Sequence, residues 1–375
     1  MGLDLKQYLN DLEYIVNIDS SSHDIAGNDR IAAFFAEAFE EAGFDVHIER
    51  AGRQQRPVLI AMTPGAGGFA FYLGGHLDTV FPAGTAAKRP YRREGGIAYG
   101  PGTVDMKSGS LLILYVAREI MKTAPQIPLC IVLNSDEELG SADSVSILRH
   151  YGSKCRRALI FEGGRKEGRL VNQRKGIAKF QIEIEGIASH SGTAPKQGAS
   201  AIVELANWIT KLDKLKNYDR GTTLNVGMIE GGTALNMVAP YSKALVEVRY
   251  VEAREYSRVV RTLERMQAKP FVERTKAKVT AISHYPPLIP TAKTKALMEQ
   301  LEKFHLEYVK AGGTSDANRL ACLDIPIIDG CGPQGGFPHS EKEFLSIETA
   351  AQRFDLMCGI IKEIGGDETG LSSKE

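Results

Sequence analysis

The feature that most constrains the fold is the alternation of short apolar runs with helical segments in the first half of the chain. Four runs are almost continuously apolar, as strands buried on both faces of a sheet are. The runs are 57–62 (PVLIAM), 69–75 (FAFYLGG), 127–134 (IPLCIVLN) and 157–164 (RALIFEGG), with helical patterns at 28–44 and 108–123. Strands that alternate with helices in this way predict the α/β class, with a mostly parallel central sheet covered by helices.

The pattern changes near residue 175, where apolar and polar residues begin to alternate along the strand-like segments. Alternation with a period of two is typical of antiparallel strands that bury one face. The expected strands are 178–188, 222–232, 243–250 and 277–283, and the expected helices are 199–215 and 256–269. We therefore predict an inserted, smaller α+β domain at 175–286, with two helices and a four-stranded antiparallel sheet.

The α/β pattern returns at residue 287, so the insertion divides one larger domain into residues 1–174 and 287–375. The second part is expected to contain helices at 294–313 and 347–364 and a strand at 325–330. The C-terminal segment 365–375 (GGDETGLSSKE) has the composition of a disordered tail.

Charge and cysteine content restrict the class of partner and the compartment. Lys and Arg together number 46, as do Asp and Glu, so no bulk charge attracts nucleic acid or an anionic membrane. No segment reaches the ~18 apolar residues of a membrane span. The N-terminal MGLDLKQYLNDLEYI predicts an acidic amphipathic helix rather than a signal peptide. Five scattered cysteines without a CxxC spacing favour reduced thiols in the cytoplasm.

Polar side chains that can bind metals or transfer protons cluster at the ends of the predicted strands of the larger domain. They are His76 and Asp78 after the second strand, Asp105 before the helix at 108–123, Asp136, Glu137 and Glu138 after the third strand, Glu162 in the fourth, and His339 in GGFPHSEKEF. Because ligands collect at the carboxyl ends of strands in open α/β sheets, we expect these groups in one crevice. Histidines and carboxylates without cysteine suit Zn, Mn or Co.

Each of these residues also has a structural interpretation when it is taken alone. His76 and Asp78 could form a hydrogen-bonded loop, Asp105 could cap the following helix, and SDEELG could be a solvated helix start. Two glycine-rich segments fit nucleotides poorly: GAGG at 65–68 precedes a strand, and GPGTVDMKSG lacks the GKS or GKT of a phosphate-binding loop. The joint occurrence of the polar groups at strand ends favours a metal site.

Six motifs, in order along the chain, resemble those of the M20 family of di-zinc metallopeptidases. They are GHLDTV, GPGTVDMKSG, DEELGS, EGG, SHSG and FPHSEKE. The resemblance is strongest to the glutamate carboxypeptidase-like and acetylornithine-deacetylase-like members and covers nearly the whole chain. It implies a di-zinc exopeptidase type of fold, with a catalytic domain at 1–174 and 287–375. The insertion at 175–286 then corresponds to a lid, which in this family often mediates homodimerisation.

The resemblance also implies the ligands of two divalent ions per subunit, with Zn expected first and Co or Mn as alternatives. His76 and Glu162 would hold one ion, Glu138 and His339 the other, and Asp105 would bridge them. Glu137 matches the general base of the family, and Asp78 matches the residue that orients His76. A carboxylate base beside such ions can take a proton from the attacking water and pass it to the leaving amine. A cis peptide bond is expected between Asp105 and Met106.

Substrate-binding residues are implied in the same way. His190 in ASHSG resembles the family histidine that reaches into the partner subunit's site and stabilises the oxyanion, although it could instead close a turn. Asn236 in ALNMVAP and Arg249 in VEVRY match positions that contact the substrate's terminal carboxylate, a task suited to the planar guanidinium. Arg249 could also be a solvated strand residue. Gly313 and Ser315 in GGTSDAN offer further donors for the anion. LNMVAP has one more residue before its proline than the family pattern.

The sequence thus predicts di-metal-dependent hydrolysis of an amide bond that releases a C-terminal amino acid, as a glutamate carboxypeptidase-like exopeptidase does. An N-acyl amino acid deacylase of the acetylornithine or succinyl-diaminopimelate type is the alternative, because the same metal core serves both reactions. A non-catalytic binding protein that retains the fold is disfavoured, since every ligand position is filled. The expected partners are a small peptide or N-acyl amino acid and a second copy of the chain.

Overall fold

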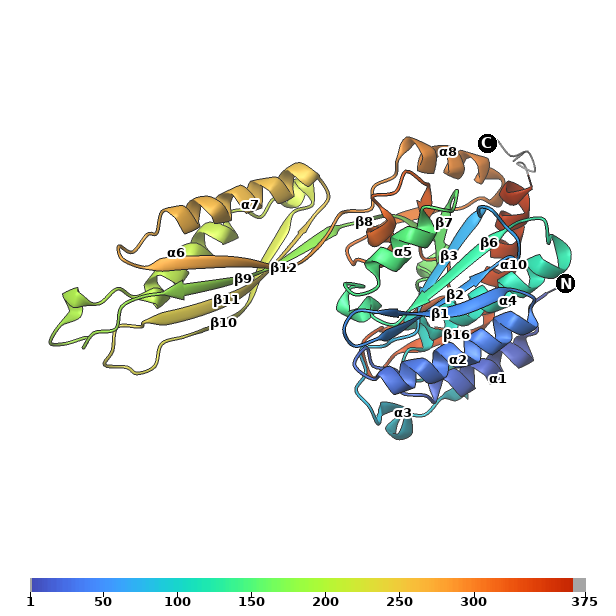
Figure 1. The fold of residues 1–375 in the computed structure, drawn as a ribbon, viewed down its shortest axis with the longest axis horizontal. Helices are drawn as coiled ribbons and strands as arrows, with labels where there is room; N and C mark the ends of the chain where they lie inside the picture. Colours follow the sequence, from blue (N-terminus) through green and yellow to red (C-terminus); the bar gives the residue numbers. More distant parts are fainter. Residues whose placement is uncertain (1, 367–375) are drawn as a thin grey trace. The chain divides into compact units, whose positions relative to one another are not determined.

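The computed structural model describes residues 2–366 and comprises two compact units (Figure 1). Met1–Gln173, Pro290–Lys310 and Ser315–Glu375 belong to the first unit, and Arg174–Ile289 and Ala311–Thr314 belong to the second. Of the tail expected to be disordered at 365–375, residues 367–375 lie outside the described part of the chain.

A six-stranded mixed sheet forms the centre of the first unit. In spatial order its strands are β1 (Asp45–Ala51), β2 (Arg56–Met62), β6 (Leu129–Asn134), β3 (Phe71–His76), β7 (Ala158–Ile160) and β14 (Ile327–Ile328). β6, β3, β7 and β14 are parallel, whereas β2 pairs antiparallel with both β6 and β1. The prediction of a mostly parallel α/β sheet is confirmed. β1 was not predicted, although Val46 and Ile48 alternate with polar residues along it.

Helices cover both faces of this sheet. Every residue of β3 and β6 is buried, and since successive side chains point to opposite faces, both faces must be covered. α4 (Ser108–Thr123) contacts β3 and β6 and packs against α1 (Leu5–Val16), α2 (Ile25–Glu41) and α10 (Ile347–Gly365). α5 (Val145–Gly152) and α9 (Asp316–Leu320) contact β6 and β7, respectively, and each other. The helix expected at 108–123 is confirmed with the same bounds.

The single helix expected at 294–313 is wrong. The chain forms α8 (Ala292–Gln300) and a short turn, and then extends as β13 (Tyr308–Ala311), which pairs with β8 (Leu170–Arg174). His305 adopts a φ of 51°, a left-handed conformation that ends the helical path. Tyr308 and Val309 have the aromatic and β-branched side chains that favour strands. The segment forms a strand because it pairs with β8, which is distant in the sequence.

A second small sheet, in the order β15–β16–β5–β4, was not predicted. Its strands are β15 (Gly335–Gly336), β16 (Phe344–Ser346), β5 (Ile97–Tyr99) and β4 (Arg92–Glu94), and α3 (Thr85–Lys88) precedes them. Strands of two or three residues are too short to show a period in the sequence. Because β16 pairs with β5, segments about 250 residues apart lie side by side, with Phe344 opposite Tyr99.

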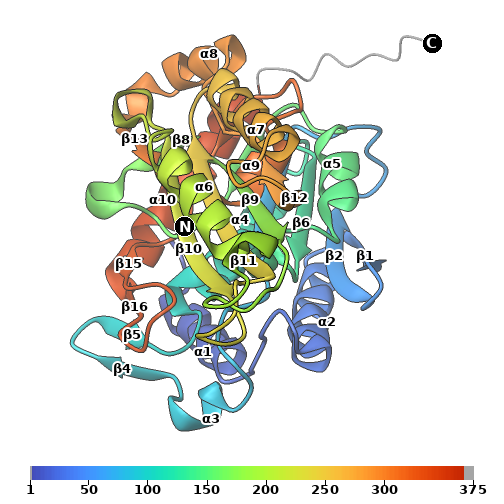
Figure 2. The same ribbon diagram turned by 90° about the vertical axis from the view of Figure 1, so that its left-hand side faces the viewer.

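The second unit is a four-stranded antiparallel sheet with two helices on one face (Figures 1 and 2). Its spatial order is β10 (Thr223–Gly231), β11 (Tyr241–Tyr250), β9 (Gly176–Glu185) and β12 (Lys276–Tyr285), with helices α6 (Ala201–Asp213) and α7 (Ala253–Ala268). Strand residues facing the helices are buried and pack around Trp208, as alternation in the sequence indicated. The predicted α+β module is confirmed.

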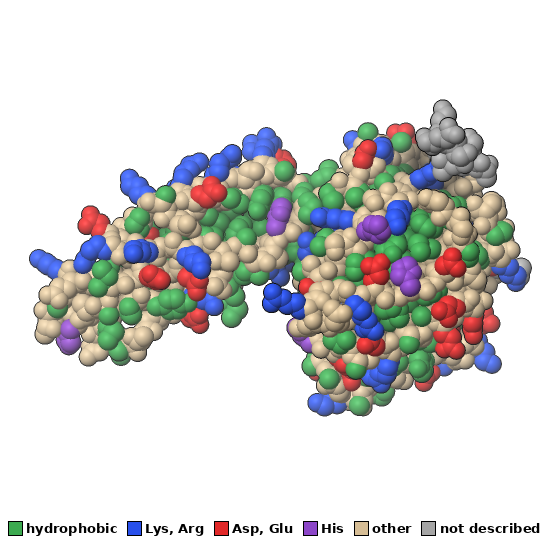
Figure 3. All heavy atoms as spheres, viewed as in Figure 1, with side chains coloured by type: hydrophobic (Ala, Val, Ile, Leu, Met, Phe, Trp, Pro, Cys, Tyr) green, Lys and Arg blue, Asp and Glu red, His purple; other side chains and the backbone are tan. Residues whose placement is uncertain are grey.

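Charged side chains of both signs are interspersed over the face drawn in Figure 3, in line with the equal numbers of acidic and basic residues. None of the helices within residues 2–366 combines the length and the apolar composition needed to cross a bilayer.

Candidate metal centre and active site

His76 ends the buried strand β3 with one ring nitrogen fixed and the other without a hydrogen bond. Its Nδ1 lies 2.9 Å from the backbone oxygen of Asp78 and 3.3 Å from the Asp78 carboxylate, so Nδ1 carries the proton and donates it. Nε2 then presents a lone pair, yet it is buried and accepts no hydrogen bond. It faces carboxylate oxygens of Asp105, at 3.3 Å, and Glu162, at 3.9 Å. This is the arrangement of a metal-binding imidazole.

Asp105 lies at the middle of the cluster, in the turn Thr103–Lys107 that leads into α4. Its Oδ1 is 3.3 Å from His76 Nε2 and its Oδ2 is 3.0 Å from His339 Nε2, so each oxygen faces a different histidine. The peptide bond between Asp105 and Met106 is cis, as the resemblance implied. One carboxylate between two imidazoles can bridge two ions.

The far side of the cluster is formed by Glu138 and His339. Glu138 follows β6 in the short helical turn Glu137–Leu139, and its Oε2 lies 3.2 Å from His339 Nε2. Its other oxygen, Oε1, is buried without a hydrogen bond. His339 is half exposed in the turn before β16, with a φ of 61°. His76 Nε2 therefore faces Asp105 and Glu162, and His339 Nε2 faces Asp105 and Glu138.

The imidazoles and carboxylates of this cluster shift one another's pKa values. Hydrogen bonds to Asp105 and Glu138 raise the pKa of His339 to about 10. Burial alone would raise the pKa of the Asp105 carboxyl, but the two imidazoles bring it below its ordinary value. Burial raises the pKa of Glu137 well above its usual range, and neighbouring carboxylates add to the effect. Packing this many carboxylates together is costly unless positive charge compensates them.

The residues present fit divalent metal ions. Ligand atoms of His76, Asp105 and Glu138 lie within 4.8 Å of one another, and so do those of His76, Glu137 and Glu162. Two buried acceptors without hydrogen bonds, His76 Nε2 and Glu138 Oε1, belong to this set. Nitrogen and carboxylate ligands without thiolate match Zn, Co or Mn better than softer or purely oxygen-bound ions.

Asp78 joins the strand that carries His76 to the turn that carries the two glutamates. It is fully buried, and its carboxylate accepts hydrogen bonds from the backbone N–H groups of Glu137 (3.2 Å) and Glu138 (3.1 Å). Ser22 Oγ donates a third, at 2.6 Å. With both backbone groups fixed, the adjacent side chains diverge: Glu138 turns to His339, and Glu137 lies with His76 and Glu162.

Three supporting residues were missed by reasoning from the sequence. Glu343 accepts hydrogen bonds from the segment that carries Asp105, and buried Lys107 donates from Nζ to the carbonyl oxygens of Ile15 and Ile18. Arg319 of α9 donates from Nε to Gly140 O, at 3.0 Å. Charged residues in FPHSEKE, DMKSG and SDANR were visible, but their burial depends on segments distant in sequence.

The second unit carries four of the predicted substrate residues, His190, Asn236, Arg249 and Gly313. His190 Nδ1 accepts hydrogen bonds from the backbone N–H groups of Gly192 and Thr193, both at 3.1 Å, so the proton of the neutral ring is on Nε2. The side chain of Asn236 is exposed. Arg249 in β11 is one-third exposed and donates to Glu247 at 2.6 Å and to Gly312 O at 2.9 Å.

Gly313 and Ser315 lie on either side of the return from the second unit to the first. The carbonyl oxygen of Gly313 accepts a hydrogen bond from Arg174 Nη1 at 3.2 Å. Ser315 is buried, and its hydroxyl donates to Asp329 at 2.5 Å and accepts from Ala317 N, which caps α9. Its backbone N–H donates to Asn318 at 3.1 Å. The polar groups of Ser315 are therefore engaged inside the unit.

The chain is similar to known hydrolases in sequence and in fold. Over 366 residues the chain is 26% identical to carboxypeptidase G2 of Pseudomonas sp. (strain RS-16). The aligned region covers 94% of this chain and 88% of that protein. It is 30% identical over 243 residues to acetylornithine deacetylase of Myxococcus xanthus. Here the aligned region covers 60% of this chain and 62% of that protein. The solved structure of aminopeptidase PepT from Bacillus cereus has a TM-score of 0.80 at 23% identity, over 96% of this chain and 99% of that one, and shares the fold.

The family model that matches describes peptidase family M20/M25/M40 and covers residues 72–363, most of the chain. This range contains His76, Asp105, Glu138, Glu162 and His339. The chain therefore belongs to peptidase family M20/M25/M40 and is a hydrolase.

Proposed function

We propose that this hydrolase uses two divalent ions to cleave an amide bond and release an amino acid with a free carboxylate. The observation that carries the proposal is the position of Asp105, each of whose two oxygens faces a different histidine. His76, Glu162 and Asp105 would hold one ion, and His339, Glu138 and Asp105 the other. When bound, such ions polarise the scissile carbonyl and lower the pKa of the attacking water towards ~7.

The chain's own residues would then move the protons. Glu137 would accept the proton of the attacking water at its carboxylate and deliver it to the leaving nitrogen. The contacts of Asp78 support this role, because they fix the backbone of Glu137 while leaving its carboxylate for the reaction. Asp78 also holds the His76 ring in the tautomer that leaves Nε2 available.

The second unit would supply recognition of the substrate. His190, with its proton on Nε2, would donate a hydrogen bond to the carbonyl oxygen as negative charge develops there. Arg249 and Asn236 would bind the free carboxylate, assisted by the backbone at Gly313. We assign Ser315 to the capping of α9 instead of substrate contact, because its hydroxyl is buried and engaged.

We place carboxypeptidase activity on a C-terminal acidic residue such as glutamate first. The match to carboxypeptidase G2 spans nearly the whole chain. Deacylation of an N-acyl amino acid comes second, supported by the shorter match to acetylornithine deacetylase. Both reactions break an amide bond next to a free carboxylate, so they share the metal cluster and differ in the acyl group.

Metal analysis and a product screen test the proposal. We expect two tightly bound divalent ions per chain after reconstitution with Zn, Co or Mn, and activity that disappears on chelation and returns with metal. A panel of dipeptides, folyl-glutamates and N-acyl amino acids should show which free amino acid is released. Activity that survives complete removal of metal would contradict the two-metal mechanism, and release only from N-acyl amino acids would favour the deacylase.

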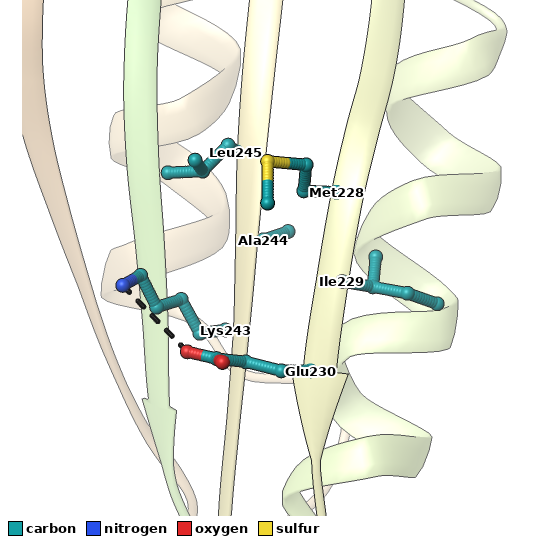
Figure 4. Close-up of a pocket in the computed structure, with 6 residues that line it drawn as sticks. All are labelled: Met228, Ile229, Glu230, Lys243, Ala244 and Leu245. Atoms are coloured by element: carbon teal, nitrogen blue, oxygen red, sulfur yellow. Dashed lines mark ion pairs between the residues drawn. The ribbon is translucent and has the colours of Figure 1, made fainter.

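We further propose a homodimer formed through the second unit. β10 is an edge strand that exposes Met228 and Ile229, and α6 beside it exposes Ile202 and Val203. Figure 4 shows Met228, Ala244 and Leu245 around a hollow between β10 and β11, with an ion pair between Lys243 and Glu230 at 3.6 Å. An exposed edge with apolar side chains is a surface that a second copy can cover.

Light scattering of the wild type and an Ile229→Lys variant tests the dimer, with Ile282→Lys on the opposite edge strand as control. We expect a dimeric wild type and control and a monomeric Ile229→Lys variant.

Five free cysteines support a reducing compartment, which we take to be the cytoplasm.

A further inference from the structure

Two segments that carry metal ligands meet in the small sheet of the first unit. β5 ends at Tyr99 and leads directly into the segment that ends at Asp105, and β16 begins at Phe344, just after the turn that carries His339. Phe344 pairs with Tyr99, so the two segments leave the sheet side by side. Strand pairing brings the segments together, but it does not set the positions of the ligands beyond the strand ends.

Glu343 connects the two segments at this point. Its side chain is fully buried, and it accepts hydrogen bonds from the backbone N–H groups of Gly102 (3.1 Å), Val104 (2.9 Å) and Asp105 (3.1 Å). Both carboxylate oxygens take part, Oε2 with Gly102 and Oε1 with the other two. Hydrogen bonds to a charged acceptor are shorter and stronger than neutral ones, so these three define the path of the segment.

The other end of the contact is a closed turn. The backbone N–H of Glu343 donates to Ser340 O at 3.2 Å, and Ser340 Oγ donates to Phe337 O at 2.8 Å. His339 lies inside this turn with a left-handed φ of 61°, a conformation that a non-glycine residue holds only when its surroundings impose it. Because these hydrogen bonds close the turn, a displacement of Glu343 would also displace His339, which lies four residues earlier.

We propose that Glu343 is a positioning residue that sets the spacing of Asp105 and His339 and thereby the affinity of the site they share. The inference rests on the proposed two-metal function. Glu343 touches neither substrate nor ion; it acts through the backbone of Asp105 on one side and the turn of His339 on the other. Residues that orient metal ligands in this way change metal affinity by about 10–100-fold when they are replaced.

The test compares Glu343→Gln with Glu341→Gln, which removes an exposed carboxylate from the same turn. Glu343→Gln keeps the shape of the side chain but replaces one carboxylate oxygen by an NH2 group. That group faces one or more backbone N–H donors and cannot accept their hydrogen bonds. We expect the dissociation constant for Zn²⁺, measured by competition with a chromophoric chelator, to rise by about 10–100-fold for one of the two ions in Glu343→Gln only. The visible spectrum of the Co²⁺-loaded protein should also change, and kcat should fall more than KM rises.

Wild-type affinity and an unchanged Co²⁺ spectrum in a folded Glu343→Gln variant would overturn the inference and leave the two-metal function intact. A wild type that binds no divalent ion would overturn the proposed function first. If Glu343→Gln does not fold, Glu343→Asp keeps the charge with a shorter reach. Its Zn²⁺ affinity and Co²⁺ spectrum should lie between those of the wild type and a ligand variant such as His339→Ala. Wild-type values for Glu343→Asp would also count against the role.

Discussion

Glu137 and Glu138 are adjacent and chemically identical, and the division of their tasks depends on contacts that only the folded chain provides. Asp78 holds both backbone N–H groups, at 3.2 and 3.1 Å. From there Glu138 reaches His339, while a carboxylate oxygen of Glu137 lies within 4.8 Å of ligand atoms of His76 and Glu162. Both carboxylates lie among possible metal ligands, so the proposed division, with Glu138 as ligand and Glu137 as base, is tested by substitution.

Replacement of each glutamate by glutamine separates the two roles. Glu137→Gln should lower kcat by about 10²–10⁴-fold, because the proton acceptor is lost, while two ions per chain remain bound. Glu138→Gln should lose an ion, which elemental analysis of the dialysed protein would reveal. If Glu137→Gln is the variant that loses metal, Glu137 is a ligand and the assignment of the base is wrong.

At the scale of elements, α9 fixes the turn that carries the glutamates. Arg319 donates from Nε and Nη2 to Gly140 O, and Ser141 donates its hydroxyl hydrogen to Asp316. Arg149 of α5 donates in turn to Arg319 O at 2.9 Å. A five-residue helix thus stabilises a turn about 175 residues earlier in the chain through charged hydrogen bonds, each of which contributes about 1.5–3 kcal/mol.

Arg319→Met should loosen the turn without removing a metal ligand. Amide hydrogen exchange at 137–141 should accelerate by about 10–100-fold, because the carbonyl of Gly140 loses its hydrogen bonds from Arg319. Each loss of about 1.4 kcal/mol in the free energy of local opening makes exchange about tenfold faster. Arg30→Met, at an exposed position on α2, serves as the control and should leave exchange there unchanged. Equal protection in Arg319→Met and the wild type would contradict a role for α9 in holding the turn.

At the scale of the whole molecule, the residues proposed for metal binding and those proposed for substrate recognition belong to different units of the chain. The five proposed metal ligands belong to the first unit, and the proposed substrate residues His190, Asn236, Arg249 and Gly313 belong to the second. If His190 acts on the site of the partner subunit, each active site requires two chains, and dimerisation is a condition of activity.

Mixing two inactive variants tests this dependence. His190→Ala and Glu137→Ala subunits each lack one group, and a heterodimer of them has one site with both groups intact. We expect activity to reappear when the variants are unfolded and refolded together, and not when each is treated alone. A verified heterodimer that stays inactive would show that His190 does not act across the dimer.

The sequence alone determined the buried strands, the helix at 108–123 and the order of the two modules. Those features follow from the local period of apolar residues, since a strand such as β6, apolar throughout, has to be buried on both faces. The chemical types of the candidate ligands were equally visible, because histidines and carboxylates interrupt that pattern at the ends of strands.

Only the tertiary structure decided which residues meet. The expected helix at 294–313 ends early because β13 pairs with β8. The small sheet forms because β16 pairs with β5, which is distant in the sequence. Glu341 and Glu343 are equivalent as sequence, yet one is exposed and the other accepts three backbone hydrogen bonds. Local periodicity specifies burial and secondary structure, whereas long-range pairing specifies contacts. Contacts distinguish the exposed carboxylate of Glu341 from that of Glu343, which holds the backbone of the proposed ligand Asp105.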